Sequence, residues 1–207
     1  MIEIYAISDQ VPERLPPEPG LSAVKSAGLV ALCAPAQDDE LSAERLWQRE
    51  EVIEALMEQC DLLPARYGTR VEDDAAAARA LDERRAELLE ALERVRGAVE
   101  LSLRVLGDEL EPDEQPSSGT DYLRAKARRA TAEAATAGGV HGPLARMARA
   151  STSQPGRATR ELLRGAYLVD RHTVGSFVQS VEDLQQANPH LRLLCTGPWP
   201  PYSFAGS

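Results

Sequence analysis

Long hydrophobic runs and paired cysteines are both missing from this sequence. None of its 207 residues lies in an uninterrupted apolar stretch of about 18 residues, so no membrane-spanning helix is expected. The three cysteines, Cys33, Cys60 and Cys195, are far apart and have apolar neighbours, which favours reduced core residues over a disulfide or a catalytic thiol. The first residues lack the basic region of a signal peptide. The sequence therefore predicts a cytoplasmic protein that does not enter a membrane.

The motifs that most catalytic and cofactor sites require are also missing. The three histidines do not have the spacing of metal ligands, and no CxxC or HxxxH pair occurs. There is no GxGxxG, no GxxxxGK[ST] and no GxSxG. The glycine-rich residues 138–143 lack a lysine and fit a turn between helices better than an anion-binding loop. We therefore predict a protein that is not an enzyme and holds neither a cofactor nor a metal.

The net charge of −10 is unevenly distributed along the chain. Residues 1–97 contain 21 acidic and 11 basic side chains, whereas residues 98–207 contain 12 of each. Within the second part, residues 121–164 carry nine basic side chains against three acidic ones. A solvated helix face, docking against an acidic surface, and nucleic-acid binding are three uses of such a segment. The acidic chain and the lack of a nucleic-acid motif argue against the third.

Hydrophobic periodicity predicts alternating strands and helices. Strands are expected at 2–7, 21–25, 29–33, 99–106, 162–169 and 191–195, with a short strand that enters a turn at 62–69. The strands at 21–25 and 29–33 fit a hairpin with Gly28 at its turn. Helices are expected at 42–61, 73–96, 121–137, 143–150 and 170–187. Ser42 and Asp73 or Asp74 are the expected helix N-caps, and Gly97 the expected stop. The helix at 42–61 is expected to have one apolar stripe, formed by Leu46, Ile53, Leu56, Met57 and Cys60. Gly138 and Gly139 are expected to break a helix, 107–120 to form a solvated loop, and 151–156 to form a connector.

This order predicts an α+β protein with two small domains of sheet and helix. We place the N-terminal α+β domain at 1–97 and a ferredoxin-like α+β domain at 98–207, with a structured tail at 196–207. In the strand at 162–169, Gly165 indicates a bulge or a close approach of the backbone to another group. The four apolar residues Val99, Leu101, Leu103 and Val105 are expected on one buried face of their strand.

The C-terminal tail concentrates the few aromatic residues of the chain. Three of the nine aromatic residues, Trp199, Tyr202 and Phe204, lie within six positions. Three nearby prolines remove backbone donors and favour an extended, polyproline-like segment. The tail either packs back on its own domain, which is the second in this prediction, or presents a stiff aromatic strip to a partner.

A second candidate contact is the run Arg66-Tyr67-Gly68 at the exit of a short strand. It fits either a partner contact or an internal salt bridge beside a turn glycine. Arg66, Tyr67, Trp199, Tyr202 and Phe204 are therefore the candidate partner-contact or tail-docking residues.

Several of these segments together resemble the gas vesicle protein GvpL/GvpF family. The terminal GPWPPYSF is the most specific of them, and the resemblance covers essentially the whole chain. The other segments are the run Leu63–Thr69, the strand Gly165–Asp170, the opening Ile4–Ile7, and the helix residues Phe177 and Val181. Ala65 and Tyr67 stand where the family usually has Val and Phe, and Gly165 where Asn is expected. These departures leave open whether the chain is GvpL-like or GvpF-like.

The resemblance implies a non-enzymatic role in building gas vesicles, the gas-filled protein shells that provide buoyancy. It implies an accessory or minor structural protein in the cytoplasm, associated with gas vesicles. The partners that it implies are the shell protein GvpA and other accessory Gvp proteins. A general interaction scaffold, or a nucleic-acid adaptor that uses residues 121–164, is the alternative.

Overall fold

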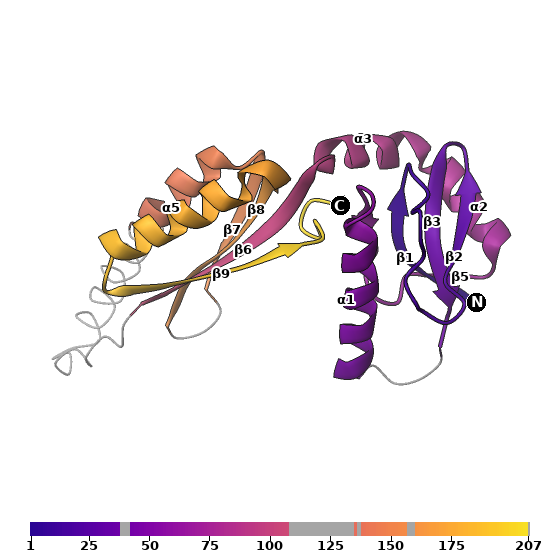
Figure 1. Cartoon of the computed structure of the whole chain (residues 1–207), viewed down its shortest axis with the longest axis horizontal. Coiled ribbons are helices and arrows are strands. Elements are labelled where there is room, and N and C mark those ends of the chain that lie inside the picture. Colours follow the sequence, from indigo (N-terminus) through magenta and orange to yellow (C-terminus); the bar gives the residue numbers. More distant parts are fainter. Residues whose placement is uncertain (38–41, 108–134, 136–137, 157–159, 207) are drawn as a thin grey trace, which may run out of the picture. The chain divides into compact units, whose positions relative to one another are not determined.

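A computed structural model describes residues 1–37, 42–107, 135, 138–156 and 160–206 (Figure 1). The chain divides into two compact units. The first is Met1–Val99 together with the C-terminal residues from Trp199, and the second is Glu100–Pro198. The expected boundary at 97 and 98 lies within two residues of this division. The tail differs from the prediction, because the residues from Trp199 group with the first unit.

The first unit contains an antiparallel sheet with the strand order β2-β3-β1-β4, in which β5 also pairs with β1. The predicted hairpin is present, and its two-residue turn has positive φ at both Ala27 (49°) and Gly28 (80°). Turns of this kind match the twist of the paired strands. The strands are β1 (Ile2–Ser8), β2 (Ser22–Ser26), β3 (Leu29–Pro35), β4 (Leu63–Pro64) and β5 (Arg70–Val71).

Three helices complete this unit: α1 (Ala43–Met57), α2 (Asp74–Glu83) and α3 (Arg85–Val95). The predicted caps are confirmed, since Ser42 Oγ accepts a hydrogen bond from the Arg45 amide and Asp73 Oδ1 accepts one from the Ala76 amide. The predicted single helix at 73–96 is wrong, because the backbone leaves the helical conformation at Arg84. Residues 82–85 are all charged, so no apolar side chain holds this stretch against the sheet.

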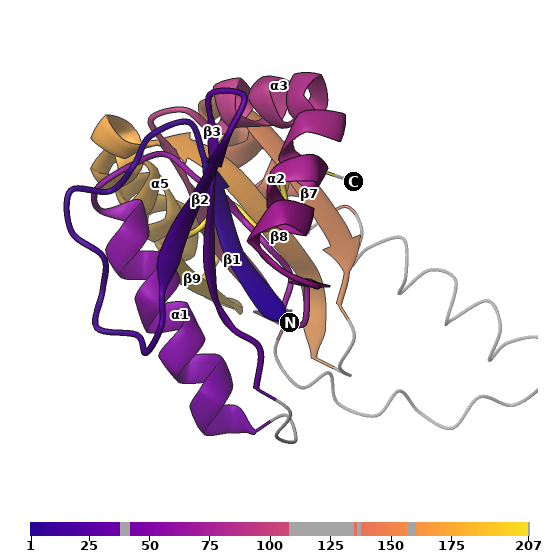
Figure 2. The same cartoon turned by 90° about the vertical axis from the view of Figure 1, so that its right-hand side faces the viewer.

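Helices cover both faces of the first sheet, with α1 on one face and α2 on the other (Figures 1 and 2). Residues 29–34 of β3 are accordingly all buried. The stripe predicted for α1 is correct at Ile53, Leu56, Met57 and Cys60, which are buried, but wrong at Leu46, which is 42% exposed. Arg49 takes a buried position on that face instead.

The second unit has the predicted ferredoxin-like arrangement. Two strand–helix–strand halves form one sheet with the order β7-β8-β6-β9, and the α+β class is confirmed. Its elements are β6 (Ala98–Gly107), a helical segment at 138–147, β7 (Ala150–Pro155), β8 (Glu161–Asp170), the 3-10 turn η1 (Arg171–Thr173), α5 (Val174–Ala187) and β9 (Leu191–Trp199).

Two local predictions fail in the second unit. Gly138 and Gly139 lie inside the helical segment, because Val140 and Leu144 are anchored in the core at 1% and 0% exposure. The expected connector at 151–156 is mostly strand β7, which pairs with β8 at the edge of the sheet. Its Ser, Thr and Gln side chains are mostly exposed, so the strand lacks the hydrophobic alternation by which a strand is predicted from sequence. The predicted helix at 121–137 and the loop at 107–120 lie almost wholly outside the described residues.

The core of the second unit is built around Tyr167, which is completely buried. Its ring lies 5.2 Å from the ring of Phe177, and its hydroxyl is hydrogen-bonded to His141 Nδ1 at 2.8 Å. All four predicted apolar residues of β6 are buried, and Leu101, Leu103 and Val105 belong to this core, whereas Val99 is the last residue of the first unit before the division. No helix among the described residues is both long and apolar enough to cross a membrane.

Gly165 gives a stability test of this core. A Cβ at Gly165 would lie 2.7 Å from the Tyr167 ring and hydroxyl, which confirms the predicted close approach. We expect Gly165→Ala to lower the free energy of unfolding by about 1–3 kcal/mol, because Tyr167 has no space to move. Urea denaturation followed by circular dichroism measures the change.

Gly175→Ala is the matched control, since a Cβ there meets no atom within 4 Å and the residue lies in α5. This variant should be unchanged or more stable by up to about 1 kcal/mol. Equal stability of Gly165→Ala and the unmodified chain would contradict the packing described for Tyr167.

Candidate functional site

The C-terminal tail forms a strand end and a tight turn. Strand β9 continues through Pro198 to Trp199, and the chain then turns with hydrogen bonds from the Tyr202 amide to the Pro200 carbonyl (2.8 Å) and from the Phe204 amide to the Pro201 carbonyl (3.1 Å). The predicted polyproline-like rod is therefore wrong beyond Pro200. The turn lets Phe204 become buried on the first unit.

Polar contacts of Tyr202 and Phe204 hold the tail on the first unit. The Tyr202 hydroxyl donates a hydrogen bond of 2.9 Å to Glu50 Oε2 on α1, and Arg94 Nη1 on α3 donates one of 3.5 Å to the Phe204 carbonyl. Burial, followed by the negative charge of Glu50, raises the pKa of Tyr202 above its usual range. The tyrosine is thus a neutral donor to a carboxylate at physiological pH. The predicted docking of the tail on the second domain is replaced by docking on the first.

A buried arginine lies at the centre of the first unit. Arg49 on α1 is 5% exposed, and its Nε lies 3.2 Å from Oε1 of the buried Glu3 on β1. Its Nη2 donates to the carbonyls of Ile4 (3.2 Å) and Ala65 (2.7 Å). The same Glu3 oxygen accepts a hydrogen bond from the Gly68 amide at 3.0 Å. One charged side chain therefore joins α1, β1 and the turn that follows β4.

Aromatic rings enclose this arginine. The Arg49 guanidinium carbon lies 5.0 Å from the ring centre of Tyr5 and 5.8 Å from that of Tyr67, both within the range of cation–π attraction. Burial is the main cause that raises the pKa of Tyr5 to about 12, and its hydroxyl donates to Glu18 at 3.2 Å. Of the candidate pair, Tyr67 therefore lies in the Arg49 cluster.

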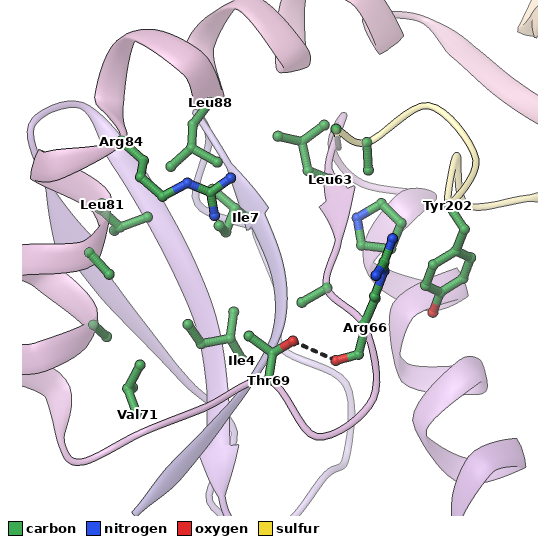
Figure 3. Close-up of a pocket in the computed structure, with 16 residues that line it drawn as sticks. Ile4, Ile7, Leu63, Arg66, Thr69, Val71, Leu81, Arg84, Leu88 and Tyr202 are labelled. Atoms are coloured by element: carbon green, nitrogen blue, oxygen red, sulfur yellow. Dashed lines mark hydrogen bonds between the residues drawn. The ribbon is translucent and has the colours of Figure 1, made fainter.

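Arg66, in contrast, is exposed. Within the described part of the chain its guanidinium makes no hydrogen bond or ion pair, so the internal salt bridge considered for it is not seen there. Arg66 and Tyr202 line one side of a pocket of about 340 Å³, while Leu81, Arg84 and Leu88 line the opposite side (Figure 3). The lining is mainly aliphatic, with no carboxylate, imidazole or thiol.

Of the five candidate residues, Tyr202 and Arg66 line one pocket. Tyr67, the residue after Arg66, lies in the Arg49 cluster. Trp199 and Phe204 belong to the same unit as these three. The sequence analysis missed Arg49 and Glu3. A signal for Arg49 was present: it precedes Ile53 by four positions and Leu56 by seven, which places it on the apolar face of α1. A charge at that position indicates a buried ion pair.

The basic segment 121–164 is only partly described. Arg124, Lys126, Arg128, Arg129 and Arg157 lie outside the described residues. Of the others, Arg149 pairs with Asp170, and Arg164 Nε lies 2.6 Å from Oε1 of Glu161. Ion pairs within the second unit therefore neutralise part of this positive charge. No described feature of the segment favours nucleic-acid binding. Among the described residues, no group of three or more His, Cys, Asp or Glu side chains is placed to hold a metal ion.

Solved structures define the class of fold. The crystal structure of gas vesicle protein GvpF from Anabaena sp. PCC7120 superimposes with a TM-score of 0.86 at 20% identity, covering 100% of this chain and 96% of that one. GvpF from Microcystis aeruginosa gives a TM-score of 0.85 at 18% identity and covers 100% and 99%. The chain therefore has the fold of these GvpF proteins.

Sequence comparison then places the chain in a family. The family described as gas vesicle synthesis protein GvpL/GvpF matches residues 4–206, and the chain belongs to it. Gas vesicle protein L of Streptomyces sp. (strain CB03234) is 33% identical over 198 residues, covering 84% of this chain and 74% of the relative. Gas vesicle protein F of the same strain is 30% identical over 212 residues, covering 91% and 89%. Membership implies a role in gas vesicle formation.

The Arg49 cluster gives a second stability test. We expect Arg49→Met to lower the free energy of unfolding by about 3–5 kcal/mol, because it leaves the Glu3 carboxylate buried without its cation. Adding Glu3→Gln should recover part of this loss, since the double variant no longer buries a lone charge. Denaturant unfolding of the two single variants and the double variant measures the coupling. Additive losses would contradict a direct Arg49–Glu3 interaction.

The tail contact gives a third test. Tyr202→Phe removes one hydrogen bond to a carboxylate, so the tail should open more easily, by about 1–2 kcal/mol. Hydrogen exchange of the amides at 199–206 should become faster in this variant and in Glu50→Gln. Glu44→Gln is the control, because Glu44 lies in the first turn of α1 and makes no described contact with the tail. Unchanged exchange in Tyr202→Phe would show that this hydrogen bond does not hold the tail.

Proposed function

We propose that this chain is a non-enzymatic accessory protein of gas vesicle assembly that binds the shell protein GvpA and other accessory Gvp proteins. The observation that carries this proposal is the family match over residues 4–206, nearly the whole chain. Both described units fall within the match, so the role applies to the protein as a whole. We place its action in the cytoplasm, at the growing vesicle.

Such an adaptor would keep a shell subunit from aggregating before assembly. A shell subunit with a strongly apolar face aggregates unless that face is covered before assembly. An accessory protein that holds the subunit, or places it at the growing edge, lowers the concentration of free apolar surface. This chain is acidic overall, which favours a monomeric, dispersed carrier over non-specific association.

The chemistry of the described residues supports a binding role over catalysis. The 340 Å³ pocket has two arginines, Thr69 and Tyr202 in an aliphatic lining, without a carboxylate, imidazole or thiol to act as a general base or nucleophile. Burial, with the negative charge of Asp74, raises the pKa of Cys33 to about 12, so its thiol is protonated at physiological pH. Burial also raises the pKa of Cys195.

Co-purification tests the proposed partner. The tagged full-length chain is co-expressed with GvpA and recovered from a lysate without detergent. We expect GvpA to be retained in amounts comparable to the tagged chain, and to remain soluble longer than GvpA expressed alone. Because the tail is part of the first unit, the whole chain is used and residues 199–206 are kept.

The unfolding-prone variant Arg49→Met is the matched control, since it should lose GvpA if binding needs the folded first unit. GvpA that is neither retained nor solubilised by the folded, unmodified chain would overturn the proposal that the chain binds the shell protein. The role of the family in gas vesicle formation would not be affected by that result.

A further inference from the structure

Helix α1 presents an unusual outer face. Trp47, one of only two tryptophans in the chain, is 66% exposed, and its neighbour Leu46 is 42% exposed. Trp47 is at a position where a helix of a monomeric protein normally carries a polar residue, and Leu46 is at the exposed end of the apolar stripe that is buried at Ile53 and Met57. A single exposed apolar residue needs no explanation, but an exposed tryptophan beside an exposed leucine is the composition of an interface anchor.

Carboxylates follow Trp47 along the same face of the helix. Glu51, Glu54 and Glu58 lie four, seven and eleven positions after Trp47, which is the spacing of one helical stripe. None of the three makes a described ion pair. Partial burial, followed by the charges of Glu50, Glu51 and Glu58, raises the pKa of Glu54, so these like charges lie close together. The stripe therefore has a negative potential, and no described ion pair neutralises its carboxylates.

A hollow lies beside this stripe. It has a volume of about 490 Å³ between α1 and the loop that joins β1 to β2, and Figure 2 shows this loop running beside α1. Hydrogen bonds between Arg14 and Gln59, one of 2.9 Å and one of 2.8 Å, hold the loop at the end of α1. The hollow is lined by Pro16, Pro17, Pro19, Glu51, Val52 and Ala55 among others. The proline, valine and alanine side chains give this lining an apolar part, and Glu18, Gln37, Gln48 and Glu51 give it a polar part.

We infer that the outer face of α1 is a docking surface for a basic amphipathic helix of a partner protein. The apolar side of that helix covers Trp47 and enters the hollow beside the proline loop. Its Lys or Arg side chains lie against Glu51, Glu54 and Glu58. Charge complementarity selects this occupant: an acidic partner segment would add like charge to the stripe, and a neutral one would leave the carboxylates partly desolvated without cations. We call residues 46, 47, 51, 54 and 58 the α1 surface.

This inference deepens the proposed function and depends on it only for the natural identity of the partner. The test therefore uses a probe that is not a gas vesicle protein. The probe is a fluorescently labelled peptide of leucine and lysine with helical amphipathic spacing and 15 residues, the length of α1. The control peptide has glutamate in place of every lysine. Binding to the full-length chain is measured by fluorescence anisotropy at low salt and again at ~0.3 M salt, which screens exposed charges.

We expect the lysine peptide to bind and the glutamate peptide not to bind. Trp47→Ala should weaken binding at least about tenfold, as for the removal of a central aromatic anchor. The double variant Glu51→Lys, Glu54→Lys should weaken it by a similar factor and reduce its salt dependence. Two controls should stay within about twofold: Glu83→Lys, an exposed acid on α2, and Met147→Ala, an exposed apolar residue of the second unit.

All of these substitutions are at solvent-accessible positions of helices, and unchanged circular dichroism establishes that each variant is folded. The inference is overturned if Trp47→Ala and the double variant bind like the unmodified chain, or if both peptides bind equally. It is also overturned if sedimentation shows that the unmodified chain forms a dimer which Trp47→Ala abolishes, because the occupant is then a second copy of the chain.

The outcomes distinguish this inference from the proposed function. If the unmodified chain fails to retain GvpA but binds the lysine peptide through Trp47, the proposed shell-protein contact is overturned and the α1 surface stands. If GvpA is retained equally by the unmodified chain and Trp47→Ala, and the peptide does not bind, the function stands and the surface is overturned.

Discussion

The buried ion pair between Arg49 and Glu3 is the interaction on which the first unit depends. Neither charge is tolerated in this interior without the other. Because Arg49 also donates to the carbonyls of Ile4 and Ala65, the pair fixes the position of α1 relative to β1 and to the turn that follows β4. The aromatic rings of Tyr5 and Tyr67 add cation–π attraction. A non-directional apolar contact would not set this position so closely.

The tail is a structural part of the same unit. The residue after Arg49 is Glu50, which accepts the Tyr202 hydrogen bond, so adjacent residues of α1 hold the sheet on one side and the end of the chain on another. The terminal segment, on which the resemblance to the GvpL/GvpF family chiefly rested, is therefore part of the first unit from Trp199 on. This accounts for an aromatic, proline-rich sequence at the tail without requiring that it touch a partner.

The two faces of helix α1 have different surroundings. Its inner face, with Arg49, Ile53 and Leu56, is committed to the sheet, while its outer face carries Trp47 and the carboxylates. A binding surface on a helix that is held rigidly from behind needs little ordering when a partner arrives, which favours affinity. The apolar pocket beside Arg66 and Tyr202 lies in the same unit. The described features that suit partner binding are therefore concentrated in the first unit.

The sequence by itself determined the α+β class, the hairpin, the caps at Ser42 and Asp73, the buried face of β6 and the family, because these depend on local patterns and motifs. Only the tertiary structure decided where long-range partners meet. Arg49 was assigned no role because its partner Glu3 is 46 positions away in the sequence, and strand β7 was missed because an edge strand with exposed polar residues has no hydrophobic alternation. The tail was assigned to the nearer half of the chain, since no local signal shows that Tyr202 finds Glu50, 152 positions earlier. Contacts between distant residues follow from packing, which a local pattern does not contain.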